Sequence, residues 1–147
     1  SGRPLDTTTL DPDGRIDAIL AWSALPGASR HHWGTDIDVI DRAATAQGYL
    51  PQLVPAEYAP GGVFHRLDAW LTASMSRFGF YRPYVRDLGG VRPEAWHLSH
   101  ADTARPACGG LTAEIMQEAI ESADIEGKER LIERMDEIRE RYVVERQ

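Results

Sequence analysis

The sequence is poor in cysteine, because Cys108 is the only one among 147 residues. A single cysteine cannot form an intrachain disulfide, and it excludes a metal site built from several thiolates. Cys108 stands next to Gly109 and Gly110, so we expect an unreactive thiol in a loop. A metal site in this chain would therefore have to use histidine and carboxylate ligands.

Positive charge and long apolar runs are also scarce. Lys and Arg number 16 against 23 Asp and Glu, and the resulting net charge of −7 leaves no basic stripe for the phosphates of a nucleic acid. No apolar run approaches the ~20 residues that cross a bilayer. Residues 1–14 lack the basic start and apolar stretch of a signal peptide. We expect no nucleic-acid partner and no transmembrane segment, and the oligomeric state stays open.

The remaining composition is that of a globular domain, with 42% apolar residues and enough aromatic residues to build a core. Periodicity and capping residues predict helices from Pro12 to before Pro26, over 62–77, over 112–123, and over a final segment. That last helix carries an apolar stripe: Leu131, Met135, Ile138 and Tyr142. Strands are predicted over 35–40 and 95–100, with a short one near 53–54 and a loop or hairpin over 80–93.

This mixed order predicts an α+β fold, in which a small antiparallel sheet has flanking helices. We expect one domain over residues 1–110 and a C-terminal helical segment, residues 111–147, packed on it.

The stretch SRHHWGTDID, residues 29–38, is rich in side chains that bind metals. His31 and Asp38 are seven residues apart, which on one continuous strand is roughly 23 Å and too far for a single ion. Gly34 lies between them and allows the chain to bend. We therefore expect His31 to reach the site from a loop and Asp38 to reach it from the strand.

The stretch PEAWH, residues 93–97, supplies the best third ligand, His97, with Glu94 three residues before it. A catalytic zinc ion takes three protein ligands and leaves one position for water. A nearby carboxylate can take a proton from that water and pass it to a leaving amine. His31, Asp38, His97 and Glu94 thus include every part of a zinc peptidase site.

Each of these residues also has an ordinary interpretation. Loop histidines are mostly solvated, Trp33 and Trp96 can be core residues, and Glu94 can be a surface carboxylate. The chain contains no HExxH helix. Spacing alone therefore leaves a metal site and a set of unrelated polar residues as alternatives.

Together the two stretches resemble the motifs of the VanY and VanX type D-Ala-D-Ala peptidases. Residues 29–38 resemble Ser-x-His-x-x-Gly-x-Ala-x-Asp, and residues 94–97 resemble Glu-x-x-His, often written Glu-x-Trp-His. The resemblance implies one zinc ion per chain held by His31, Asp38 and His97, with Glu94 activating the zinc-bound water. It also implies the fold that these peptidases share with Hedgehog signalling domains, with the zinc site on the sheet.

The implied activity is a D-alanyl-D-alanine carboxypeptidase that cuts the terminal bond of peptidoglycan stem peptides. An L,D-carboxypeptidase, a peptidoglycan endopeptidase and a non-catalytic zinc-containing binding module, as in Hedgehog domains, remain alternatives. Because such a substrate lies outside the cytoplasmic membrane, the resemblance implies an envelope, periplasmic or secreted location. Candidate substrate contacts are Ser29, Arg30, Asp36 and Trp96.

The chain departs from the family pattern at two points. Asp36 stands where the motif has Ala, on the same strand face as Asp38, and it can be a partner that contacts a metal ligand, a substrate contact or an alternative ligand. The family's upstream segment, with an arginine that grips the substrate carboxylate, has no counterpart here, so we expect the later part of a longer domain. Arg30, Arg82 or Arg86 can take that role, whereas His32 and His100 are expected not to be ligands.

Overall fold

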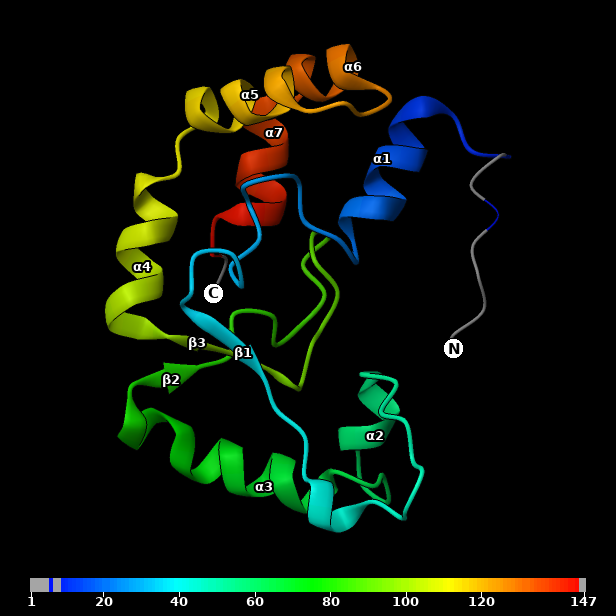
Figure 1. Ribbon diagram of the computed structural model, residues 1–147, viewed down its shortest axis with the longest axis vertical. Helices are drawn as coiled ribbons and strands as arrows, with labels where there is room; N and C mark the ends of the chain where they lie inside the picture. The colour runs from blue at the N-terminus through cyan, green and yellow to red at the C-terminus, as the bar shows by residue number, and fades with distance from the viewer. Residues whose placement is uncertain (1–5, 7–8, 146–147) are drawn as a thin grey trace.

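The structure, a computed structural model, describes residue 6 and residues 9–145. It has a mixed α/β architecture in which helices lie on either side of a small antiparallel sheet (Figure 1). The central strand β3 (His97–His100) pairs with β1 (Asp36–Asp38) on one edge and with β2 (Phe80–Tyr81) on the other. The small antiparallel sheet predicted from the sequence is confirmed.

The helices divide between the two sides of this sheet (Figure 1). On one side lie α2 (Pro55–Tyr58) and α3 (His65–Ser74). On the other side lie α1 (Pro12–Leu20), α4 (Ala101–Gly110), α5 (Ala113–Ser122), α6 (Lys128–Glu133) and α7 (Met135–Ile138). Short 3-10 turns lie at Arg42–Ala44 and Met75–Phe78, and a π turn lies at Arg139–Val143. Among the described residues, no helix has both the length and the apolarity needed to span a bilayer.

Local signals in the sequence explain several helix boundaries. The Asp11 carboxylate accepts a hydrogen bond from the Gly14 amide at 2.7 Å, and Pro12 occupies the first position of α1. Thr112 caps α5 in the same way. The helical segment that begins with α3 stops at Gly79, whose φ of 78° lies in the left-handed region that glycine adopts easily. These predicted caps are confirmed.

Three local predictions are wrong. Residues 53–54 form no strand, because Pro55 starts α2 and Val54 takes its N-cap position. The first helix ends at Leu20 rather than just before Pro26, since the amides of Trp22 and Ser23 both donate to the Ile19 carbonyl and turn the chain there. Cys108 lies in α4 and not in a loop. This helix forms despite Pro106 because Ala104 and Cys108, four residues apart, are buried on one face.

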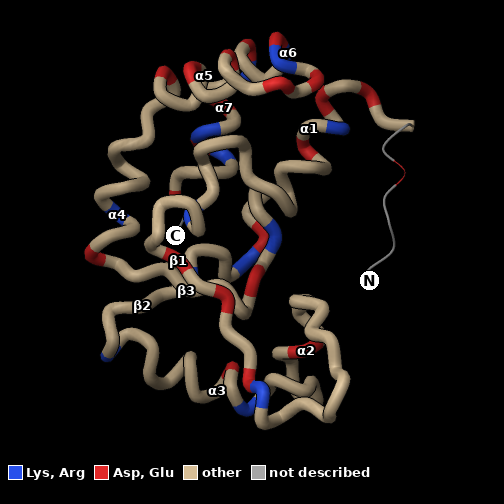
Figure 2. Tube along the Cα trace, in the orientation of Figure 1, with Lys and Arg blue, Asp and Glu red and all other residues tan. Residues whose placement is uncertain are grey.

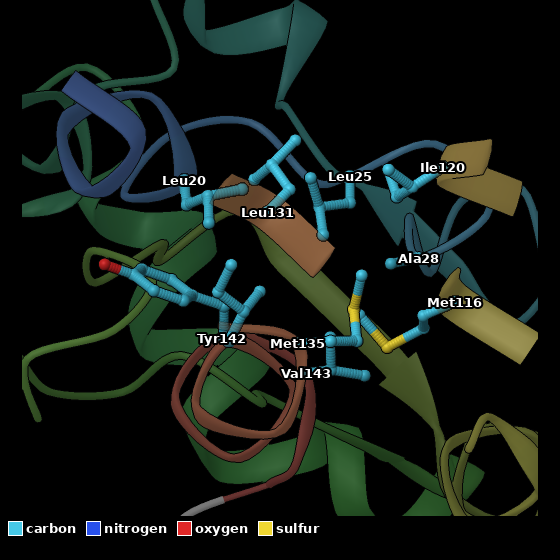
Figure 3. Close-up of a cluster of buried hydrophobic side chains, with 10 residues drawn as sticks. Leu20, Leu25, Ala28, Met116, Ile120, Leu131, Met135, Tyr142 and Val143 are labelled. Atoms are coloured by element: carbon cyan, nitrogen blue, oxygen red, sulfur yellow. The ribbon is translucent and has the colours of Figure 1, made fainter. Parts of the chain in front are cut away.

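The larger apolar core joins α1 to the C-terminal helices (Figure 3). The predicted stripe on the last helical segment is buried, and Ile138 at its centre is fully enclosed. Leu25 and Ala28, in the loop that follows α1, pack into the same cluster. Burial of this loop holds the start of the 29–38 segment against the C-terminal helices.

A smaller core on the other side consists of Tyr58, Phe64 and Trp96. The Tyr58 hydroxyl donates a hydrogen bond to the Val39 carbonyl at 2.7 Å, directly after β1. The Tyr58 ring also lies 5.7 Å from the Trp96 ring, directly before β3. This core therefore holds together the ends of the two strands that carry the predicted ligands.

Ion pairs tie the C-terminal helices to α1. Arg130 pairs with Asp13 at 2.6 Å, and Arg134 pairs with Asp17 at 2.7 Å. Figure 2 shows both acidic and basic positions on α1 and on α6. The Arg130–Asp13 pair is exposed and screened by solvent, so the buried apolar core dominates this contact.

Candidate metal centre and active site

Antiparallel pairing of β1 with β3 brings the two sequence motifs together. The register sets Asp38 opposite His97 and Asp36 opposite Ser99. Side chains of directly opposed residues lie on the same face of the sheet and close to one another. Two stretches about sixty residues apart in the chain therefore share one site.

His31 reaches this site from a turn that precedes β1. The His32 amide donates to the Ser29 carbonyl at 3.0 Å, and the Gly34 amide donates to the His31 carbonyl at 3.1 Å. Gly34 has a φ of 73°, which glycine adopts at little cost. The chain thus reverses between His31 and Asp38, as the sequence predicts from Gly34.

His31, Asp38 and His97 form a compact group of donor atoms. One ligand atom from each lies within 4.8 Å of the others. The Asp38 Oδ1 atom is 3.5 Å from His31 Nε2 and 3.6 Å from His97 Nδ1. Two atoms that each bind a tetrahedral zinc ion at about 2.0–2.1 Å lie roughly 3.3 Å apart. The donor set and its spacing therefore fit a single zinc ion.

Glu94 lies beside this group. Its Oε2 atom is 3.0 Å from His97 Nδ1, and its side chain is 14% exposed. The Glu94 amide donates to the Tyr84 carbonyl at 2.9 Å, which holds the residue next to the start of β3. A carboxylate in this position can transfer protons at a metal ion that these three donors hold.

The other ring nitrogen of His97 faces Asp36. His97 Nε2 lies 2.7 Å from Asp36 Oδ1, and the Asp36 side chain is fully buried. The hydroxyl of Ser99 donates to the same oxygen, and the hydroxyl of Thr35 donates to Oδ2. Asp36 and Asp38 thus contact opposite edges of one imidazole ring.

Burial and hydrogen bonding shift the pKa values of Asp36 and His97 in opposite directions. Burial raises the pKa of Asp36, but hydrogen bonds from His97, Ser99 and Thr35 outweigh it and hold that pKa below its usual 3.8. Burial lowers the pKa of His97, but its contacts with Asp36 and Glu94 raise it to about 9. Without a metal, His97 therefore carries a second proton at neutral pH.

Zinc binding is expected to release a proton and to strengthen as the pH rises. A metal needs the unprotonated Nδ1 of His97, and the pKa near 9 means that a proton occupies it at pH 7. If His97 alone loses a proton, the apparent affinity rises about tenfold per pH unit up to about pH 9. Chelator competition at several pH values and calorimetry in two buffers measure this, and a constant affinity between pH 7 and 8.5 would contradict it.

A cleft of about 350 Å³ opens at the site. Its lining includes all four proposed metal and catalytic residues: His31, Asp38, Glu94 and His97. Ser29, Arg30 and Trp96, which the sequence suggests as substrate contacts, line the same cleft. Sequence reasoning missed Trp22, Leu53 and Tyr84, which also line it. Trp22 is 61% exposed, and nothing in the local sequence distinguishes it from a core tryptophan.

The arginines proposed to hold a substrate carboxylate differ in their surroundings. The Arg30 side chain is 2% exposed, and its guanidinium pairs with Glu145 at 2.9 Å. Arg82 pairs with Asp68 at 2.8 Å, and Arg86 is exposed.

The remaining two histidines near the motifs lie outside the donor group. His32 is exposed, and the His100 ring packs against Phe80 with its centroid 5.2 Å away.

Comparison with known proteins agrees with the two motifs. The family model VanY, described as D-alanyl-D-alanine carboxypeptidase, matches residues 9–103, which contain both motifs. A protein of Haemophilus influenzae strain Rd, described only as uncharacterized, is 34% identical over 122 residues, which cover 82% of this chain and 93% of that protein. No solved structure matches the chain significantly. The family match covers most of the chain, and the motif residues lie in one cleft. We therefore conclude that this chain belongs to the VanY family of D-alanyl-D-alanine carboxypeptidases.

Proposed function

We propose that this protein is a zinc-dependent D-alanyl-D-alanine carboxypeptidase that hydrolyses the terminal peptide bond of peptidoglycan stem peptides. Membership of the VanY family implies a peptidase with a peptide substrate. The observation that carries the finer proposal is the position of Glu94, whose carboxylate lies 3.0 Å from a ring nitrogen of the His31–Asp38–His97 group, in a cleft that all four residues line.

In this proposal His31, Asp38 and His97 hold the ion through two nitrogen atoms and one carboxylate oxygen. A zinc ion bound there supplies a Lewis acid that makes water a better nucleophile near pH 7 and polarises the scissile carbonyl. His31 and Asp38 contribute half-exposed side chains, at 41% and 33%, while His97 is buried. The site is therefore open to substrate on the side of His31 and Asp38.

Glu94 moves the protons of the reaction. Its carboxylate accepts a proton from water while the water oxygen bonds to the carbonyl carbon of the scissile amide. Glu94 then gives that proton to the leaving nitrogen, and the carbon–nitrogen bond breaks. The remaining proton of the water leaves the new carboxyl group and ends on the amino group of D-alanine, so the products are the shortened peptide with a new carboxylate and free D-alanine, and Glu94 returns to its starting form.

The walls of the cleft provide the binding surface. Trp22 and Leu53 present apolar surface, and Ser29 presents a hydroxyl group that can hydrogen-bond to a peptide. Trp96 is only 4% exposed, so it contributes through the shape of the wall. A peptidoglycan substrate also supports an envelope or secreted location, since that polymer lies outside the cytoplasmic membrane.

The test is the release of D-alanine from defined stem peptides. The zinc-loaded protein is incubated with a pentapeptide ending in D-Ala-D-Ala, a tetrapeptide, a cross-linked dimer and free D-Ala-D-Ala, and products are identified by mass spectrometry. We expect the pentapeptide to lose one D-alanine, and its analogue ending in L-Ala-L-Ala to remain intact.

The other substrates separate the alternatives. Loss of D-alanine from the tetrapeptide alone would indicate an L,D-carboxypeptidase, and cleavage of the dimer alone would indicate an endopeptidase. Cleavage of only the free dipeptide would indicate a dipeptidase. Zinc binding without cleavage of any of these would overturn the proposal in favour of a non-catalytic zinc module.

A further inference from the structure

We propose that Asp36 is a positioning residue of the metal centre, and that it acts through a buried chain of hydrogen bonds that runs from Arg30 through Ser99 and Asp36 to His97. In this chain Asp36 holds one edge of the His97 ring, so that the other edge faces the metal. The proposal rests on the metal site of the proposed function, but it does not depend on the substrate or on turnover.

The two ring nitrogens of His97 face different carboxylates, and this geometry excludes Asp36 as a ligand of the same metal ion. His97 Nε2 lies 2.7 Å from Asp36 Oδ1, whereas Nδ1 lies 3.6 Å from Asp38 Oδ1. The lone pairs of the two imidazole nitrogens point away from each other, so an ion on Nδ1 cannot also lie at Asp36. Asp36 therefore contacts a ligand without being one.

The strand register explains how Asp36 reaches His97. Asp36 is two residues before Asp38 and shares its face of β1. Asp38 lies directly opposite His97, so Asp36 lies diagonally from His97 and directly opposite Ser99. The family motif has alanine at this position, and an alanine offers no oxygen to the ring. This chain therefore carries a contact to its metal ligand that the motif does not supply.

The donors and acceptors around Asp36 show which nitrogen of His97 carries the hydrogen. An arginine can only donate, so the bond of 3.3 Å from Arg30 Nη1 to Ser99 Oγ uses a lone pair of the hydroxyl. The single proton of Ser99 is then directed to Asp36 Oδ1. Because the charged carboxylate can only accept, His97 Nε2 must carry a hydrogen. The neutral ring then has its lone pair on Nδ1, the nitrogen that faces Asp38 and Glu94.

Burial keeps this chain in one arrangement. Asp36 is fully buried and the side chains of Arg30 and His97 are 2% and 5% exposed. Glu145 binds the far side of the Arg30 guanidinium at 2.9 Å and balances its charge. Both oxygens of the buried Asp36 carboxylate accept hydrogen bonds, and these bonds hold the side chain in one orientation. We accordingly assign Arg30 to this chain rather than to the substrate.

The test measures metal binding by Asp36→Asn and Asp36→Ala. Carboxylate partners of metal-bound histidines typically contribute 10–100-fold to metal affinity. We expect the zinc affinity to fall by about that factor in Asp36→Ala and by about tenfold in Asp36→Asn, which keeps the side-chain shape. Both variants should still bind one zinc ion per chain at saturation, and the cobalt-substituted Asp36→Ala protein should show shifted visible absorption bands.

Ile37→Thr is the matched control, because Ile37 lies between the two aspartates on β1 and is 48% exposed. It should keep the parent's zinc affinity and cobalt spectrum. Circular dichroism establishes that each variant is folded, and Asp36→Asn still tests the proposal if Asp36→Ala does not fold. Unchanged affinity and spectrum in Asp36→Asn would overturn the proposal. It would also be overturned if Asp36→Asn lost zinc as completely as Asp38→Ala, because Asp36 would then be a ligand.

Discussion

Replacing Glu94 with glutamine is expected to lower kcat by about 10²–10⁴-fold, the range that a positioned acid–base group contributes. The amide of glutamine cannot take a proton from the attacking water. The side chain keeps its length, and Glu94 is not one of the three donors that lie within 4.8 Å of one another. The zinc content should therefore stay at one ion per chain while turnover is lost.

The measurement compares D-alanine release with zinc content, determined by elemental mass spectrometry, on the same protein samples. Glu121→Gln is a matched control, since Glu121 lies on α5 and its carboxylate accepts a hydrogen bond from Gln117. It should retain the parent's activity. Full activity in Glu94→Gln would contradict the assigned proton transfer, even if zinc binding were established.

Replacing His97 with alanine is expected to reduce zinc affinity by more than about 100-fold, because loss of a ligand exceeds the usual cost of losing a ligand's hydrogen-bond partner. A second effect follows from burial. Asp36 is fully buried and loses one of its donors, which should lower the free energy of unfolding of the metal-free protein by about 1–3 kcal/mol. Chelator competition measures the first effect, and urea unfolding with excess chelator measures the second.

His31→Ala should show the loss of zinc without the same loss of stability, because the His31 side chain is 41% exposed. His32→Ala is the matched control for it, since His32 is the neighbouring, exposed histidine. The assignment of ligands would be wrong if His97→Ala bound zinc like the parent protein, or if His32→Ala lost it.

Much of the site can be predicted from the sequence because a metal centre needs particular atoms. Histidine nitrogens are few in a chain with five histidines, and Gly34 marks the bend that lets His31 and Asp38 approach one another. The caps at Asp11 and Thr112 are local interactions, and they were predicted for the same reason.

Predictions failed where long-range packing outweighs local preference. Helix α4 contains Pro106 and ends in two glycines, which is unfavourable for a helix, yet burial of Ala104 and Cys108 stabilises it. The cleft residues Trp22 and Leu53 have no distinctive sequence pattern. They reach the site only because α1 and the loop before α2 end beside it.

The sequence by itself determined which groups this protein can offer to a metal: the two histidines, two aspartates and one glutamate of its two motifs. Only the tertiary structure decided which of these groups lie next to one another. The register of β1 against β3 sets Asp38 at one edge of the His97 ring and buries Asp36 at the other. Burial also pairs Arg30, one of the candidate substrate contacts, with Ser99 and Glu145. Alternation along a strand tells which residues share a face, but only strand pairing tells which atoms meet across it.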